Sequence, residues 1–325
     1  MAGDYPRHCG PEAQGEADTL MLRGRAYRVA TLLFAVLLSA AIGPAQEFEP
    51  RTYAVAPVGL NFVGIGYGFA TGGIFMDPAL PVKDVDGDVH LVVARYVRSL
   101  SLFNRPAKVK VVVPWSSGHW EGTVEDDPAT RDATGLADMR IVVETQFSGA
   151  RPMTPEEMRT YKPRTVFGAR MQVVVPTGDY DNIRGINLGA NRWAFIPELG
   201  LSTPAGKWSI EAAMGAWFFT DNDDYFNGRF LEQDPLLVAK FLAVRNIRPG
   251  LWWSLGAGYG YGGKTYVDGV PRDTIQRNWR LFAMVAYPIT PSQGVSLSIG
   301  SGGNYGAGTD FDAITVGYQF AWGGD

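Results

Sequence analysis

Three short patterns in the sequence use residue types that carry chemistry in other proteins. Residues 258–265 read Gly-Tyr-Gly-Tyr-Gly-Gly-Lys-Thr, which is the spacing of a phosphate-binding loop. His119 follows two serines at 116 and 117, a combination that could supply a nucleophile and its base. Carboxylate oxygens, the ligands that calcium prefers, cluster in three further segments, at 84–88, 125–127 and 221–224.

Each pattern lacks the element that would position its chemistry. A phosphate-binding loop must lead into a helix, whereas Asp268-Gly269-Val270-Pro271 predicts a turn. His119 falls in a predicted loop and His90 at the mouth of a predicted strand, without the rigid orientation that a catalytic pair needs. The acidic segments lack the EF-hand spacing. We therefore predict no catalytic residues, no metal site and no cofactor, and keep a barrel-embedded lipid hydrolase as an alternative.

The segment 138–147 has the most regular pattern in the chain, because apolar and polar residues alternate along it. Successive side chains of a strand point to opposite faces, so this period of two predicts a strand. Ile141 and Val143 belong to its apolar face, and Arg140 and Glu144 to its charged face. A soluble sandwich would place such charges in water, whereas a membrane barrel would turn them into its lumen.

Similar alternation recurs in about twelve segments, more than the eight strands of a lipocalin. They are residues 59–69, 89–97, 108–115, 138–147, 165–175, 191–201, 208–219, 236–243, 251–261, 279–287, 295–300 and 313–322. Long connections at 70–88, 115–136, 176–190, 220–235, 262–278 and 301–312 alternate with mostly short ones. The exception is 148–164, where Thr154-Pro155-Glu156-Glu157 predicts the start of a short helix. This pattern predicts an all-β fold, a transmembrane antiparallel β-barrel with short periplasmic turns and long outer loops, rather than a secreted sandwich.

The polar faces of these strands would line the lumen, where charges must be paired or hydrated. Both signs of charge occur, so the side chains form either a salt-bridged ladder that partly fills the bore or a charged path for a solute. Gly66 and Gly258 lie on glycine-rich inner faces, which predict a smooth wall with space beside it. The other residues of the predicted lining are Lys110, Asp138, Arg140, Glu144, Arg170, Gln172, Arg192, Glu198, Glu211, Lys240 and Arg280.

The amino terminus predicts export from the cytoplasm. Several arginines after Met21 precede an apolar run at 29–42 and then Gly43-Pro44-Ala45, which is the layout of a signal peptide. Cleavage is expected after Ala45, with Ala41 as the rival position, and either Met1 or Met21 starts the chain. Residues 1–45 are therefore an upstream extension plus a removed signal peptide, and residues 46–325 form a single barrel domain.

The composition limits the kinds of partner that the protein is expected to bind. The net charge of −4 argues against a nucleic-acid-binding protein, which needs a basic patch. The only cysteine, Cys9, lies in the removed part, so the barrel needs no disulfide. Tryptophan and tyrosine near the strand ends suit the two membrane interfaces. The expected partners are outer-membrane lipids, lipopolysaccharide and a small-molecule solute, and the oligomeric state is left open.

Several short motifs also resemble a known family, in an order that covers nearly all of the chain after the leader. They include Pro57-x-Gly59-x-Asn61, Leu102-Phe103-Asn104-Arg105, Pro176-Thr177-Gly178-x-Tyr180, Asn187-x-Gly189-x-Asn191-Arg192-Trp193 and Gly308-x-Asp310-Phe311-Asp312. The chain resembles the bacterial outer-membrane proteins grouped under a meta-pathway of phenol degradation. The resemblance implies a channel or transporter in the cell outer membrane for small hydrophobic or aromatic solutes. A structural barrel with a plugged lumen is the alternative.

Overall fold

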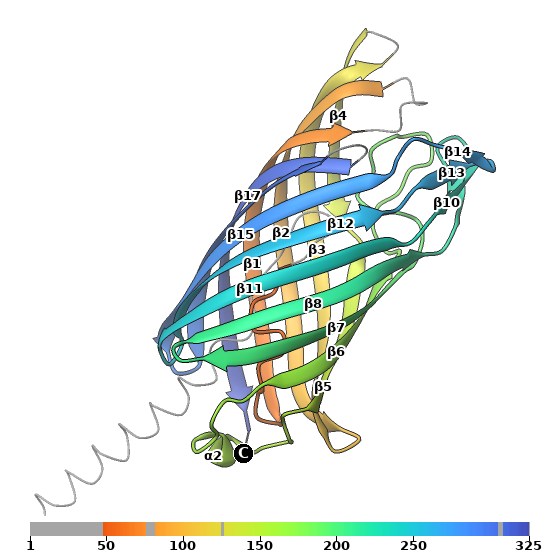
Figure 1. Ribbon diagram of the computed structural model, residues 1–325. Helices are drawn as coiled ribbons and strands as arrows, with labels where there is room; N and C mark the ends of the chain where they lie inside the picture. Colours follow the sequence, from red (N-terminus) through yellow and green to blue (C-terminus); the bar gives the residue numbers. More distant parts are fainter. Residues whose placement is uncertain (1–47, 76–81, 125–126, 305–307, 325) are drawn as a thin grey trace, which may run out of the picture.

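The computed structural model describes residues 48–75, 82–124, 127–304 and 308–324 (Figure 1). Within them, a 12-strand antiparallel barrel closes where β1 pairs with β17, from Leu60 opposite Gly323 to Phe75 opposite Gly308. The predicted leader and its cleavage site lie outside the described residues. The barrel strands are β1 (Leu60–Phe75), β2 (Val82–Leu102), β3 (Arg105–Val124), β5 (Met139–Ser148), β6 (Val166–Val175), β7 (Ala194–Ala205), β8 (Trp208–Phe219), β11 (Leu236–Arg248), β12 (Leu251–Gly262), β15 (Gln276–Thr290), β16 (Gln293–Asn304) and β17 (Gly308–Gly323).

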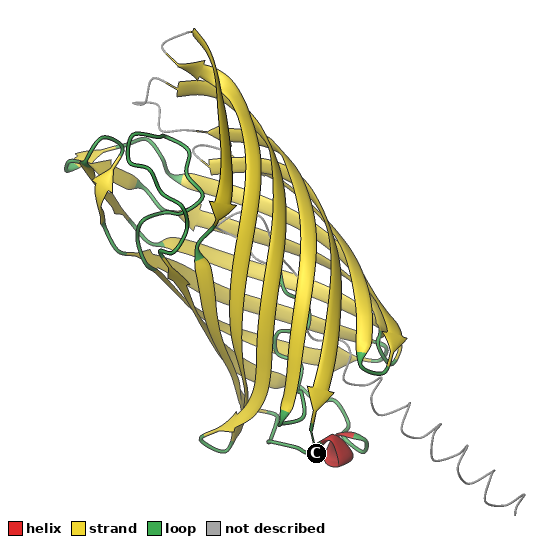
Figure 2. Ribbon diagram, turned by 180° about the vertical axis from the view of Figure 1, so that it is seen from behind, coloured by secondary structure: helices red, strands yellow, loops and turns green. Residues whose placement is uncertain are grey.

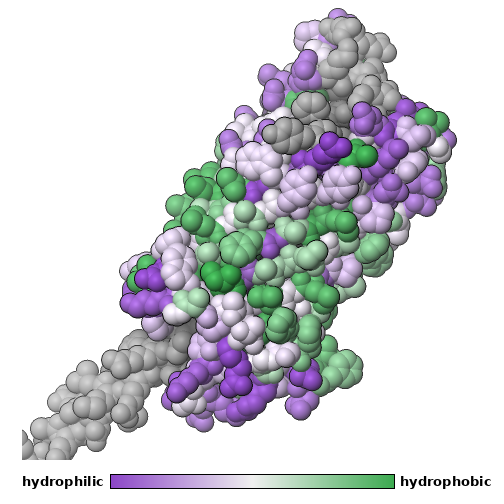
Figure 3. All heavy atoms as spheres, in the orientation of Figure 1, coloured by the Kyte–Doolittle hydropathy of each residue, from purple (hydrophilic) through white to green (hydrophobic). Residues whose placement is uncertain are grey.

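Alternation fixes which side chains face outward. On β5, Val142, Glu144 and Gln146 are buried, whereas Ile141 and Phe147 are exposed. The same inversion holds around the wall, where most exposed large side chains are apolar and many buried ones are polar. Figure 3 shows a hydrophobic band across the middle of the barrel between hydrophilic ends. This arrangement is that of a membrane barrel, so the predicted fold and its polarity are confirmed.

One end of the barrel has tight turns and the only helix labelled in Figure 1. The two residues between β2 and β3, Phe103 and Asn104, both have positive φ (49° and 58°), as a two-residue hairpin with a type I′ turn requires. The predicted helix is confirmed as α2 (Pro155–Met158), where Thr154 and Glu157 form a reciprocal capping box. Figure 2 shows the carboxyl terminus beside this helix. Across the described ranges, no helix is long and apolar enough to span a membrane.

The other end differs from expectation, because much of the sequence predicted as long loops is strand. β1, β2 and β3 run on through most of 70–88 and 115–124, and β4 (Asp127–Leu136) continues the hairpin by pairing with β3. A four-stranded sheet forms from β9 (Asn222–Tyr225), β10 (Arg229–Gln233), β13 (Thr265–Val267) and β14 (Val270–Pro271). The prediction of loops was wrong here because strands beyond the bilayer need no apolar face. Residues 176–190 do form a loop.

We expect the end with the long hairpins to face the cell exterior. Cysteines at Glu121 or Asp223, both exposed beyond that end, should react with a membrane-impermeant maleimide on intact cells. Cysteines at Arg159 or Lys207, exposed at the α2 end, should react only after the outer membrane is broken. The barrel itself contributes no competing thiol, since Cys9 is the only cysteine. Equal labelling of both pairs on intact cells would contradict this orientation.

Candidate functional site

Residues 48–58 lie inside the barrel, in its half near α2 (Figure 1). Phe48, Glu49, Thr52 and Tyr53 are all buried, and their partners lie on the inner faces of the strands. The stretch is fixed at its far end by the Ser99 hydroxyl, which donates to the Pro57 carbonyl (2.6 Å). We name residues 48–58 the lumen segment. It occupies space that the sequence pattern leaves open for a solute.

A buried ion cluster joins the lumen segment to the wall. The Lys110 ammonium lies 2.6 Å from the Glu49 carboxylate and 2.5 Å from that of Glu144. Lys108 pairs with Glu144 at 2.8 Å and donates to the Thr52 carbonyl at 2.7 Å. Two guanidinium groups complete the cluster at slightly longer range: Arg95 lies 3.5 Å and Arg170 3.7 Å from Glu49. Four strands, β2, β3, β5 and β6, position these groups. On each strand every second side chain points into the lumen, and the charged residues of the cluster are all on that inner face.

Two further carboxylates of the wall bind the lumen segment. The Tyr53 hydroxyl donates to Glu198 (2.8 Å), which also pairs with Lys240. The Arg51 amide donates to Glu211 (2.8 Å). The predicted residues Glu198 and Glu211 therefore both bind a stretch of chain outside every predicted strand, and Lys240 pairs with Glu198 directly.

Glycines of the wall make room for the aromatic rings of the lumen segment. A Cβ at Gly200 would lie 2.1 Å from the Tyr53 ring, and one at Gly168 would lie 2.6 Å from it. A Cβ at Gly258 would lie 2.9 Å from the ring of Phe48. The space predicted beside Gly258 therefore exists, and Phe48 occupies it. Phe48 also stacks on Phe282, with 5.3 Å between the ring centroids.

The other predicted lining residues lie outside this cluster or at its margin. Gln172 accepts a hydrogen bond from Arg170 (2.7 Å). Arg192 bonds to Gln233 and lies over the Phe219 ring, 4.5 Å from its centroid. Arg140 lies on β5 opposite Val112 and Val174. Gly66 on β1 pairs with Val93 and Gly317 near the barrel closure.

Asp138 fastens the long loop 176–190 to the wall. Its two carboxylate oxygens accept hydrogen bonds from the amides of Gly178 (2.9 Å) and Ala190 (2.8 Å). The loop then packs Ile186 and Leu188 against Val85 and Trp120. Because Trp120 is buried on the inner side of β3, this loop narrows the mouth opposite to the lumen segment.

The wall itself is incompletely paired between two strands. β16 and β17 pair from Gln293 opposite Phe320 to Gly300 opposite Ala313, and in the described residues their pairing goes no further. β16 nevertheless continues along β15 to Asn304, and β17 continues along β1 to Gly308. We call the space between residues 301–304 and 308–312 the lateral gap.

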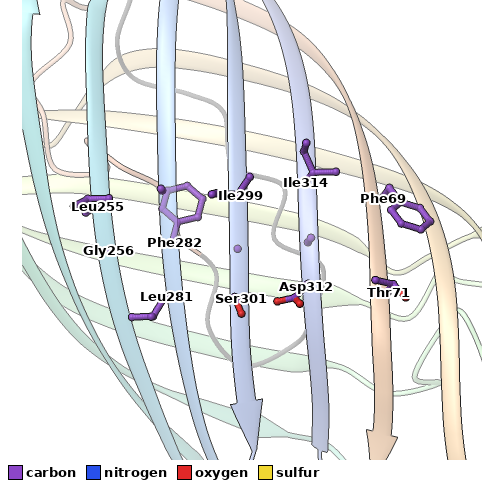
Figure 4. Close-up of a pocket in the computed structure, with 13 residues that line it drawn as sticks. Phe69, Thr71, Leu255, Gly256, Leu281, Phe282, Ile299, Ser301, Asp312 and Ile314 are labelled. Atoms are coloured by element: carbon purple, nitrogen blue, oxygen red, sulfur yellow. The ribbon is translucent and has the colours of Figure 1, made fainter.

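A largely apolar cavity of about 640 Å³ lies at the base of the lateral gap (Figure 4). Its lining includes the last paired residues, Gly300 and Ala313, and the first unpaired ones, Ser301 and Asp312. Further lining residues are exposed on the outer wall, namely Leu255, Leu281, Ile299 and Ile314. Phe282, which stacks on Phe48, also lines it. The cavity thus adjoins both the outer wall and the ring that contacts the lumen segment.

Arg280 bridges the lateral gap. Its guanidinium donates to the carbonyl oxygen (2.8 Å) and the hydroxyl (3.0 Å) of Thr309 on β17. To get there from β15 it crosses β16 at Gly302, where a Cβ would lie 2.3 Å from the Arg280 Cδ. Arg280, one of the predicted lining residues, therefore lies at the lateral gap.

The structure does not arrange the histidines, the serine and the glycine-rich stretch of the sequence analysis as catalysis or phosphate binding would require. His119 lies on β3, not in the expected loop, and its ring bonds to Asp132 (2.7 Å). The His90 ring bonds to the Tyr67 hydroxyl (2.7 Å), and the Ser117 hydroxyl bonds to Thr134 (2.8 Å). Strand β13 follows the glycine-rich stretch at 258–265 where a phosphate site needs a helix. Over the described ranges, no three His, Cys, Asp or Glu side chains are grouped to hold a metal ion.

The lumen segment is the functional feature that alternation misses. Of its partners on the wall, Lys110, Arg170, Glu198 and Glu211 were predicted as inward-facing and Arg95 was not. The segment itself was assigned to no element. Pro50 and Pro57 remove two backbone donors and exclude a regular strand there. The available signal is the run of charged and aromatic residues directly after the predicted cleavage site, which is unlike a solvated tail.

Solved structures with a similar fold are outer-membrane barrels. An outer membrane channel from Pseudomonas putida F1 superposes with a TM-score of 0.71 at 20% identity, covering 85% of this chain and 100% of that one. The β domain of the Bordetella autotransporter Brka gives a TM-score of 0.48 at 10% identity, over 82% of this chain and 100% of that one. No curated protein matches the sequence. The first likeness supports the fold of an outer-membrane channel.

Residues 78–320 match the model of a family described as "Putative MetA-pathway of phenol degradation". The match covers more than half of the chain and confirms the resemblance seen in its motifs. The protein is an outer-membrane β-barrel. The chain belongs to this family of outer-membrane proteins.

Proposed function

We propose that the protein lets small apolar solutes, aromatic ones among them, pass from the outer mouth of the barrel through the lateral gap into the membrane. The observation that supports this most is the end of β16–β17 pairing at Gly300 and Ala313, beside an apolar cavity of about 640 Å³. A pocket of this size is ample for a single aromatic ring. The description of the family, which mentions phenol degradation, agrees with that class of solute.

The occupied lumen favours a sideways route over an axial one. The lumen segment is buried in the half of the barrel near α2, and its charges are paired with the wall. An apolar solute would have to displace these ion pairs to continue along the axis, and would gain little in a polar site. The cavity at the lateral gap instead provides an apolar solute with contacts to Leu281, Ile299 and Ile314. Apolar contacts of this kind continue directly into the lipid hydrocarbon.

Filling the cavity should slow the passage of an apolar probe. Ile299→Trp adds a large side chain to the cavity without touching the lumen segment, and Leu199→Trp makes the same kind of change on the exposed β7 wall. We expect intact cells that produce the wild-type protein to take up N-phenyl-1-naphthylamine several-fold faster than cells without it. Ile299→Trp should lose most of that increase, and Leu199→Trp should keep it.

Integrity of the outer membrane is checked with nitrocefin, whose hydrolysis by a periplasmic β-lactamase should be equally slow in all these cells. Uptake of the naphthylamine that is unaffected by the wild-type protein would contradict the proposal. It would favour the second candidate, a structural barrel with a plugged lumen, for which the lumen segment and the inward loop 176–190 are the supporting observations.

A further inference from the structure

The ion cluster of the lumen contains a carboxylate that does not belong to the wall. Lys108, Lys110, Glu144 and Arg170 are anchored in adjacent strands, which hold them together by backbone pairing. Glu49 comes from the lumen segment and reaches the cluster as a tethered group. The wall therefore provides the cationic side chains, and the lumen segment supplies the Glu49 carboxylate that lies between them.

Charge favours an anion at this position. Four cationic side chains meet two carboxylates in the cluster, and Glu144 is the one that would remain if Glu49 left. Lys108 and Lys110 are both almost fully buried, so water could hydrate them only poorly. A buried charge needs a partner of opposite sign. Another carboxylate would therefore be favoured wherever Glu49 is displaced.

Phe48, the residue beside Glu49, indicates that such a ligand would also carry an aromatic ring. Phe48 places an aromatic ring on Phe282 and on the flat floor at Gly256 and Gly258, where Cβ atoms would lie 3.2 Å and 2.9 Å from it. Phe48 and Glu49 thus present a ring and a carboxylate to two prepared surfaces of the lumen. A free molecule with both groups matches the same chemistry.

The remaining anchors allow the end of the lumen segment to move without detaching. Pro57 and Val58 stay bound to Ser99 and Met153 at the α2 end. Between them and Glu49, the wall holds the segment through hydrogen bonds from the Arg51 amide to Glu211, from the Tyr53 hydroxyl to Glu198 and from Lys108 to the Thr52 carbonyl. The Arg51 guanidinium also bonds to Asn246, and the Tyr53 ring packs at Gly168 and Gly200. Loss of the Glu49 pairs would release the amino-terminal end of this stretch from Arg95, Lys110 and Arg170.

We propose that the cluster of Arg95, Lys108, Lys110 and Arg170 is a binding site for the carboxylate of aromatic monocarboxylates. Glu49 occupies the cluster as a built-in competitor, and Phe48 occupies the separate aromatic surface at Phe282. Binding displaces the lumen segment and opens the axial path towards the α2 end. This proposal goes beyond the lateral route of apolar solutes, since an anion would not pass from the barrel into lipid hydrocarbon.

The test uses purified full-length protein in detergent, with phenylacetate as the probe, its uncharged analogue phenylacetamide and ringless acetate as controls. We expect Glu49→Gln to bind phenylacetate at least ten-fold more tightly than the wild type in calorimetry, because the competing charge is gone. Phenylacetamide should show no such gain and acetate a smaller one. Equal affinities of wild type and Glu49→Gln for phenylacetate, or an equal gain for phenylacetamide, would overturn the carboxylate site. An equal gain for acetate would overturn the aromatic part.

A second readout leaves Glu49 in place. Thr52→Cys puts a thiol at a buried position of the lumen segment, and its reaction with a water-soluble maleimide should accelerate several-fold with phenylacetate but not with phenylacetamide. Labelling that phenylacetate leaves unchanged would contradict displacement, provided that heat-modifiable mobility shows a folded barrel. Naphthylamine uptake by cells tests the lateral route separately, so either proposal can fail while the other stands.

Discussion

Glu144→Ala should destabilise the barrel by about 3–5 kcal/mol, the range for removing one partner of a buried ion pair. Glu144 is fully buried on β5, within ion-pair distance of Lys108, Lys110 and Arg170. Its loss removes the carboxylate that pairs with Lys108 and leaves Lys110 and Arg170 with Glu49, in a lumen half that the chain itself fills. The cost is measured as the free energy of unfolding in urea, from barrels folded into lipid vesicles and followed by tryptophan fluorescence.

Gln146→Ala is the matched control for this substitution. Gln146 lies two residues further along the same face of β5 and is equally buried, but it is uncharged. We expect a cost of about 1–3 kcal/mol, typical of a lost buried polar contact. If Glu144→Ala costs no more than Gln146→Ala, the cluster is hydrated and does not hold the lumen segment as described.

Alternation was sufficient to predict the barrel wall. On β5, each residue from Ile141 to Phe147 has the face that its position in the pattern assigns, because a pleated backbone allows no other choice once one face is in lipid. The predicted inward side chains of Glu144, Arg170 and Glu198 are likewise buried. Their partners across the strands followed only from the register, which the sequence pattern does not contain.

Two features needed the three-dimensional structure because neither depends on periodicity. The lumen segment is irregular, and Glu49 meets Lys110 across 61 residues of sequence. The lateral gap lies between two regular strands, so the sequence pattern gives no sign of it. β16 and β17 continue as strands beyond Gly300 and Ala313, where their pairing with each other ends. The alternation of a sequence predicts that a segment is a strand, but it does not predict where that strand stops pairing with its neighbour.

Sealing the lateral gap with a disulfide should abolish the uptake of apolar probes. Ser301 and Asp312 are exposed residues directly after the last paired positions, and Figure 4 shows them side by side on β16 and β17. Both positions come one residue after the last registered pair, so they are the first at which a disulfide, which requires Cα atoms within about 7 Å, would join the unpaired parts of the two strands. The control places cysteines at Leu297 and Val316, which face each other where the two strands are already paired.

The most direct measurement is therefore naphthylamine uptake by intact cells that produce Ser301→Cys/Asp312→Cys, before and after reduction with dithiothreitol. Passage through the lateral gap predicts uptake at the level of cells without the protein while the disulfide is closed, and the wild-type rate after reduction. The Leu297→Cys/Val316→Cys control should show the wild-type rate in both states. A closed disulfide that leaves uptake at the wild-type rate would show that solutes do not pass between β16 and β17.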